Sequence, residues 1–156
     1  MPLRYQPMPS DLAARYRRRE PDAYGLTPEL HVSDGQGMPC RHCLVNIAEG
    51  DGYLILSYRP FPELQPYAET GPIFLHADQC EAYVGGAAVP PILTTSKDYL
   101  LRGYSADDRI VYGTGAVIPV TGIDARASEL LEKPEVAYVH VRSARNNCYQ
   151  CRIERA

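Results

Sequence analysis

The clearest periodic pattern along the chain is an apolar stripe with helical spacing near residue 127. Its positions recur at i, i+4, i+7 and i+8, so they fall on one side of a helix. They are Ile123, Ala127, Leu130 and Leu131. The pattern predicts a helix that opens at residues 121–124 and that Pro134 stops, with the stripe facing the core.

Capping residues indicate two more helices. Ser10 stands before an apolar pair, Leu12 and Tyr16, which lie one turn apart, and this order is typical of an N-capped helix. Asp78 and Glu81 have the spacing of a capping box, although two adjacent glycines soon afterwards limit that helix to about two turns. We therefore expect two or three short helices in all.

Runs of β-branched and aromatic residues, bounded by turn-forming residues, predict about seven strands built largely from hairpins. The predicted hairpins pair residues 44–48 with 53–58, 98–104 with 109–112, and 136–142 with 148–154, and a further strand is expected at 73–76. Residues 21–39, rich in Pro, Gly and Asp, are expected to form a loop. The predicted fold class is α+β, with a mostly antiparallel sheet.

Length and charge bound the class of protein. A chain of 156 residues fits a single domain over residues 1–156. The formal net charge of −3 argues against a dedicated nucleic-acid binder, which needs a basic face. No segment has the apolar length of a membrane span or of a secretory signal, so we expect a cytoplasmic protein that does not contact a membrane.

A local cluster of arginines qualifies this picture. If the helix that begins at Ser10 continued far enough, Arg15, Arg18 and Arg19 would share one face of it. Such a face suits a protein partner or a small anion. Because the chain as a whole is acidic, we expect no appreciable binding of duplex nucleic acid.

Cysteine and histidine spacing predicts a metal site. Cys40 and Cys43 are three residues apart, and two thiolates at this spacing can hold one soft divalent ion. His76 and Cys80 follow about thirty residues later and would complete a tetrahedral set of three thiolates and one imidazole. The ion expected at Cys40, Cys43, His76 and Cys80 is a structural zinc.

Two other uses of the cysteines stay open. The pair Cys40 and Cys43, with a histidine beside the second thiol, is also the pattern of a thiol-redox site, which needs the first cysteine at a helix N-terminus. Alternatively, Cys148 and Cys151 could join the first pair in a four-thiolate site. If residues 148–154 form a strand, however, these two thiols point to opposite faces and stay inert.

The motifs resemble two families. The segment from Cys40 through Ile47 to Gly50, with His76 and Cys80 later, is similar to treble-clef zinc fingers, including those of poly(ADP-ribose) polymerases. Over nearly the whole chain the sequence resembles the bacterial domain-of-unknown-function family 1203. This second resemblance is carried by residues 39–44, 58–61, 71–77 and 148–155. It implies a single-domain protein of about this length and carries over no catalytic residue.

Two functions follow from these observations. The first is a small binding or interaction module with a structural zinc site. The second is an enzyme with a polar pocket, in which several segments would converge at the end of the sheet. The pocket would be formed near Tyr58, Arg59, Tyr67, Glu69 and His76. His140 shares a strand face with Tyr138 and Arg142, where we expect a hydrogen-bonded structural histidine.

Overall fold

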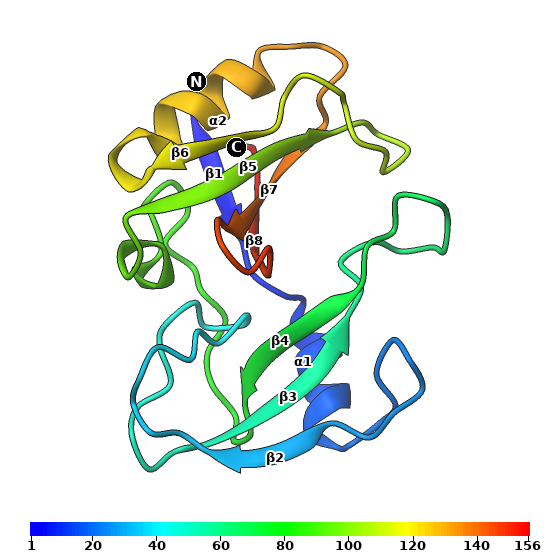
Figure 1. Ribbon diagram of the computed structural model, residues 1–156, viewed down its shortest axis with the longest axis vertical. Coiled ribbons are helices and arrows are strands. Elements are labelled where there is room, and N and C mark those ends of the chain that lie inside the picture. The colour runs from blue at the N-terminus through cyan, green and yellow to red at the C-terminus, as the bar shows by residue number, and fades with distance from the viewer.

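Two antiparallel sheets stacked along the long axis of the molecule form the fold (Figure 1). The computed structural model describes residues 1–156. Its strands are β1 (Leu3–Gln6), β2 (Glu29–Val32), β3 (Gly52–Tyr58), β4 (Gly71–His76), β5 (Asp98–Tyr104), β6 (Ala116–Pro119), β7 (Tyr138–Ser143) and β8 (Tyr149–Arg155). The helices are α1 (Ser10–Arg17) and α2 (Ile123–Leu131), with 3-10 turns η1 (Pro91–Thr94) and η2 (Val120–Gly122).

The upper lobe in Figure 1 is the five-stranded sheet together with α2. Its strand order is β1-β8-β7-β5-β6, so the first strand of the chain pairs with the last. Strand alternation turns Val139 and Val141 of β7 into the core beneath α2, and the predicted apolar stripe of α2 is fully buried there. The helix prediction for this segment is confirmed.

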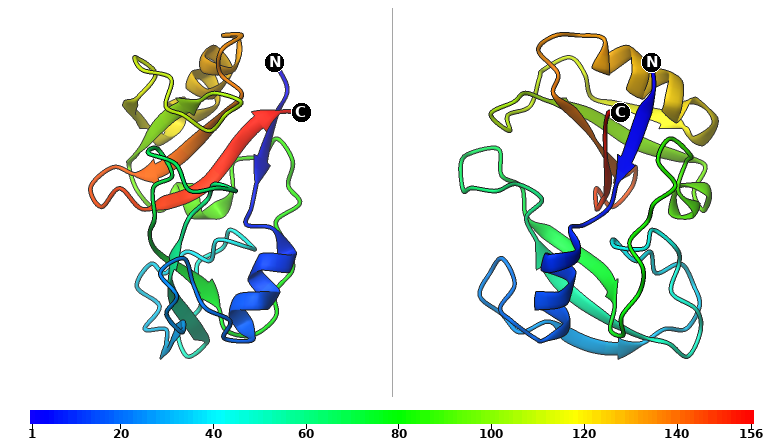
Figure 2. Two further views of the ribbon diagram at one scale, coloured as in Figure 1. Left: turned by 90° about the vertical axis from the view of Figure 1, so that its right-hand side faces the viewer. Right: turned by 180° about the vertical axis from the view of Figure 1, so that it is seen from behind.

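The lower lobe is the three-stranded sheet β2-β3-β4 together with α1, which lies in front of the sheet in the right-hand view of Figure 2. Ala13 and Tyr16 of α1 share a buried cluster with Leu54 and Leu56 of β3. All four residues of β2 are exposed, because this strand forms the edge of the sheet. The lower core is therefore thinner than the upper one.

The lobes meet through a loop. Residues 59–70 leave β3 and cover the face of the upper sheet opposite α2. Phe61 of this loop packs 5.3 Å from the ring of Tyr104 and 5.1 Å from that of His140, measured between centroids. Tyr58 of β3 likewise contacts Tyr149 of β8, at 5.7 Å. The aromatic layer thus fixes one lobe on the other.

The predicted antiparallel α+β class is confirmed, but eight strands in two sheets replace about seven in one. Residues 44–48 form no strand, and β3 pairs instead with β2, which lies in the predicted loop, and with β4. Residues 109–112 make only an isolated bridge, and β6 takes the predicted place beside β5. No helix follows Asp78, because the chain there is drawn toward the cysteine cluster.

The predicted arginine face is wrong. Helix α1 ends at Arg17, and Arg19 has a left-handed backbone with φ of 63°, so it lies outside the helix. Arg15 and Arg18 both pair with Glu20, which offsets their charge. Ser10 is the first helical residue and makes no capping hydrogen bond.

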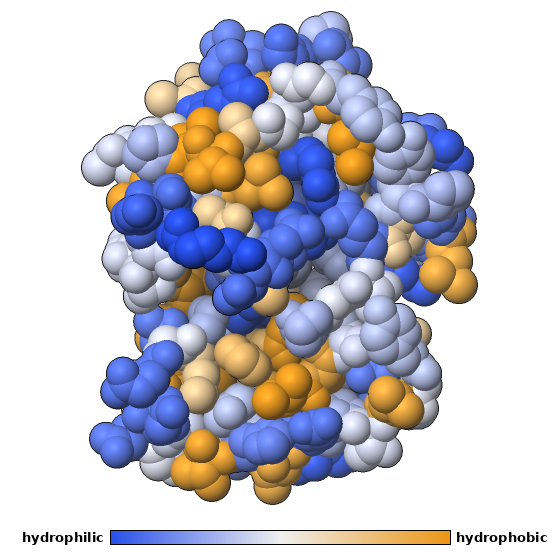
Figure 3. Space-filling model, viewed as in Figure 1, coloured by the Kyte–Doolittle hydropathy of each residue, from blue (hydrophilic) through white to orange (hydrophobic).

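Hydrophilic residues cover much of the face drawn in Figure 3, with apolar patches distributed over both lobes. Neither α-helix has the length and the apolar run that a membrane crossing requires. The exposed apolar side chains include Leu30 and Val32 of β2, at the free edge of the lower sheet.

Candidate metal centre

The structure brings Cys40, Cys43, His76 and Cys80 together. Their ligand atoms all lie within 4.8 Å of one another. The sulfur atoms of Cys40 and Cys80 are 3.9 Å apart, and the Cys43 sulfur lies 3.4 Å from Nδ1 of His76. Two sulfur ligands 2.3 Å from one tetrahedral ion would be about 3.8 Å apart, and a sulfur–nitrogen pair slightly closer. The spacing of the four groups therefore suits a tetrahedral ion.

Each ligand is placed by a different local structure. Cys40 and Cys43 lie on a tight turn in which the Leu44 amide donates to the Cys40 carbonyl at 3.0 Å. Leu44 adopts a left-handed φ of 57°, a strained conformation for a branched residue, and its side chain is fully buried. His76 is the last residue of β4, and Cys80 follows in the next loop. The turn, rather than the predicted hairpin, presents the first two thiols.

Groups from α1 and the turn surround the Cys80 sulfur. Arg17 donates to this sulfur from Nη2 at 2.9 Å, and its Nε donates to the His76 carbonyl at 3.1 Å. The His42 ring lies with Nδ1 3.2 Å from the same sulfur, while its Nε2 is 2.9 Å from the Ser10 hydroxyl. Burial, and secondarily the charge of Arg17, lowers the pKa of His42, so a neutral ring donates to sulfur and accepts from Ser10.

The cluster favours negative charge on the Cys40 sulfur. Hydrogen bonds from Cys43 and Cys80 hold the pKa of Cys40 far below its usual range, while Cys43 retains its proton and has a raised pKa. Hydrogen bonding to Cys40 and Cys80 raises the pKa of His76 to about 10. A divalent cation bound to all four groups would replace these shared protons, which is how metal binding at thiol sites couples to proton release.

The comparisons with known proteins give one match. The sequence model of the family described as protein of unknown function (DUF1203) matches residues 37–155. The chain belongs to this family. No curated protein and no solved structure matches the chain.

The part of the chain that matches DUF1203 contains all four candidate ligands, whereas Ser10 and Arg17 lie before it. Sequence reasoning named the four ligands but not the groups around them. His42 stands between the two cysteines of the motif, which is a usable signal. Nothing local indicates Arg17, because its approach to Cys80 depends on how α1 packs on the sheet.

The redox alternative is not supported by the geometry of this family member. The turn after Cys43 leads into an irregular segment, so no helix N-terminus lowers the pKa of a thiol there. The four-thiolate alternative also fails, because Cys148 and Cys151 lie outside the cluster. Cys151 is fully buried in the upper core, and burial raises its pKa to about 12.

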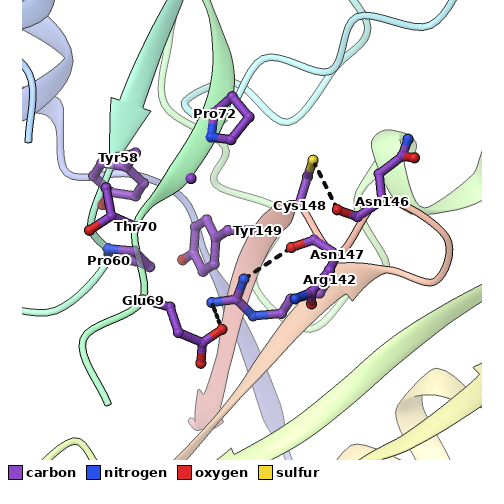
Figure 4. A pocket seen from close by; sticks show the side chains of 11 residues that line it. Tyr58, Pro60, Glu69, Thr70, Pro72, Arg142, Asn146, Asn147, Cys148 and Tyr149 are labelled. Atoms are coloured by element: carbon purple, nitrogen blue, oxygen red, sulfur yellow. Dashed lines mark hydrogen bonds and ion pairs between the residues drawn. The ribbon is translucent and has the colours of Figure 1, made fainter. Parts of the chain in front are cut away.

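The predicted polar pocket assembles only in part. Tyr58 and Glu69 line a cavity of about 400 Å³ between the lobes, together with Arg142 and Tyr149 (Figure 4). His76 belongs to the metal cluster instead. His140 is fully buried as a strand residue beside this cavity, but neither ring nitrogen has a hydrogen-bond partner, contrary to the expected hydrogen bond.

Proposed function

We propose that this protein is a small binding module whose lower lobe is held together by a structural zinc ion at Cys40, Cys43, His76 and Cys80. The observation that carries the proposal is the mutual spacing of the four ligand atoms, which suits one tetrahedral ion. Three sulfurs and one imidazole form a soft donor set, which favours zinc over magnesium or calcium. The binding partner would be a protein or a small anion.

The donor set supports a structural role over a catalytic one. Catalytic zinc keeps one position for water or substrate and therefore has three protein ligands, whereas structural zinc has four. Here four ligands come from three segments: the turn after β2, the end of β4, and the loop that follows. One ion would tie all three segments to each other and, through Arg17, to α1.

Charge balance adds support. Three thiolates around a divalent ion leave a net charge of −1 at a partly buried position. The Arg17 guanidinium, 2.9 Å from the Cys80 sulfur, supplies the compensating charge, and the His42 ring supplies a neutral donor. Such outer contacts orient metal ligands and stabilise the charged form of a thiolate.

The experiment is metal analysis of protein purified without added zinc or chelator. We expect close to one zinc per chain, and we expect Cys43→Ser to lower both the zinc content and the melting temperature. The matched control is Cys148→Ser, a cysteine outside the cluster, which should retain the zinc. Metal-free protein that melts as cooperatively as the zinc-loaded form would contradict a structural zinc.

A further inference from the structure

We infer that the cavity between the lobes binds a small organic carboxylate at the guanidinium of Arg142. This site lies apart from the metal cluster and deepens the proposed binding role by naming a ligand class. The cavity, about 400 Å³, is within the range of small-molecule sites. In Figure 4 the β3 and β4 ends form one wall, and Arg142 with the turn before β8 forms the other.

Arg142 is a buried cation with donor capacity left over. Its side chain is only 6% exposed. Its Nη1 donates to the Asn147 carbonyl at 3.1 Å, and its Nη2 lies 3.3 Å from a carboxylate oxygen of Glu69. Its Nε is buried and has no hydrogen-bond partner. That atom has almost no accessible surface, so a ligand in the cavity cannot reach it. The terminal nitrogens carry two N–H groups each and use one, which leaves a second donor on each for an acceptor in the cavity.

Two arginines share one carboxylate at this position. Glu69 accepts from Arg102 at 2.5 Å and from the Tyr104 hydroxyl at 2.9 Å with one oxygen, and pairs with Arg142 through the other. The cluster of Arg102, Arg142 and Glu69 therefore keeps a residual positive charge. A monoanion in the cavity would neutralise it.

The neighbouring carboxylates do not supply this charge. Asp108 accepts from the Tyr138 hydroxyl, and Glu154 pairs with Arg4 and Arg152. Behind Arg142 lies His140, whose pKa is lowered well below its usual value by burial and then by the surrounding arginines. The neutral imidazole adds no negative charge, and Arg142 is the arginine of this group that lines the cavity.

The rest of the cavity wall decides the shape of the ligand. Tyr58, Pro60, Pro72 and Tyr149 offer apolar surface, while Asn146 and Thr70 offer amide and hydroxyl groups at the rim. A carboxylate that carries a short apolar or aromatic body fits this combination, because the charged end meets Arg142 and the body covers the rings and prolines. Inorganic phosphate lacks such a body and should bind more weakly.

Glu69 acts as an internal competitor in this arrangement. It stands on the 59–70 loop, whereas its three donors belong to β5 and β7 of the upper sheet. Removing its charge while keeping its shape should therefore free the donors for an external carboxylate. The substitution Glu69→Gln does this, and Glu63→Gln makes the same charge change at an exposed position of the same loop.

The experiment is an NMR titration of the purified, metal-loaded protein with benzoate, and with benzamide as its uncharged counterpart. We expect benzoate, but not benzamide, to shift the amide signals of Thr70, Asn147 and Cys148. Glu69→Gln should tighten benzoate binding by about fivefold, the scale of one partly exposed ion pair, and Glu63→Gln should not. A gain in affinity cannot arise from misfolding.

Several results would overturn the inference: equal binding of benzamide and benzoate, phosphate binding as tight as benzoate, or a Glu69→Gln protein with unchanged or weaker affinity. Arg142→Lys, which keeps the charge but loses the planar fork, should weaken benzoate binding while the protein still melts cooperatively. Zinc content is measured on the same samples. Because the cavity and the metal cluster share no residue, failure of benzoate binding and failure of zinc binding are separate outcomes.

Discussion

The two lobes use different means to hold a small sheet together. The upper lobe closes five strands and α2 around one cluster of 16 buried residues. The lower lobe has three strands, an exposed edge strand and a cluster of 12, one of which, Tyr149, comes from β8. Sheets of this size need more than their own core, and a metal ion is one of the usual additions. The comparison shows that the cysteine cluster lies in the lobe with the smaller buried core, where an added cross-link would contribute most to stability.

Removing the metal should produce the largest difference in stability between the two lobes. After chelation, we expect the amides of β3 and β4 to lose hydrogen-exchange protection by at least about 3 kcal/mol, because a structural zinc contributes directly to folding free energy. The amides of β5 and β7 should keep most of their protection. Native-state hydrogen exchange by mass spectrometry measures both sets at once.

The control for chelation is a cavity in the other lobe. Leu130→Ala removes a fully buried side chain of α2 and should cost about 3 kcal/mol in the upper lobe while the zinc content stays the same. Equal loss of protection in both lobes after chelation would show that the lobes are a single cooperative unit.

A smaller effect on the free energy of unfolding should come from the pH and from His140 in the upper sheet. Burial, then the charges of Arg142, Arg152 and Arg102, lowers the pKa of His140 well below 6.5. An unfolded histidine takes up a proton near pH 6.5, whereas the folded side chain stays neutral. The free energy of unfolding should therefore fall as the pH drops below about 6.5, by up to ~1.4 kcal/mol per pH unit from this residue.

The measurement is urea unfolding at pH 7.5 and pH 5.5. His140→Phe should reduce the loss of stability on acidification, because the variant lacks the proton uptake on unfolding. Both proteins carry the same metal cluster, so its own titration cancels in the difference. His31→Phe, on the exposed strand β2, serves as the matched histidine control. An identical pH dependence in wild type and His140→Phe would contradict the assignment.

The smallest effect is a difference in thiol reactivity, without a change in stability. Cys148 lies half-buried at the cavity, whereas Cys151 is fully buried in the upper core. In the zinc-loaded protein a thiol reagent should therefore modify Cys148 quickly and Cys151 only after unfolding. Mass spectrometry of the labelled peptides measures the two rates, and Cys148→Ser should remove the fast phase. Equal rates at both positions would mean that the upper core opens readily.

Local signals predicted the parts of this molecule that local forces determine. The apolar stripe of α2 identified the buried face of this helix, because residues at helical spacing lie on the same side. Residue type and spacing likewise grouped the four candidate ligands, since few residue types can hold a soft ion. In each case the information lies within a short segment or in uncommon side chains.

The structural features that the sequence did not predict depend on packing between segments far apart in the chain. Strand β2 has only four residues, and although polar and apolar residues alternate along it, all four are exposed, so no buried face marks the segment as a strand. The capping-box pattern after Asp78 gave no helix, because Cys80 is positioned by the cluster rather than by its own segment. The ion pairs of Glu69 with Arg102 and Arg142 join residues far apart in the chain, and no local pattern indicates them.

The pairing of β1 with β8 has a consequence for how the chain folds during synthesis. Leu3 is opposite Arg155, so the edge of the upper sheet cannot form until the last strand has been made. The cysteine cluster, in contrast, is complete once residue 80 has emerged. At translation rates of about 5–20 residues per second, the intervening 75 or so residues take roughly 4–15 s. The four candidate ligands of the lower lobe are therefore all synthesised several seconds before β1 can pair with β8.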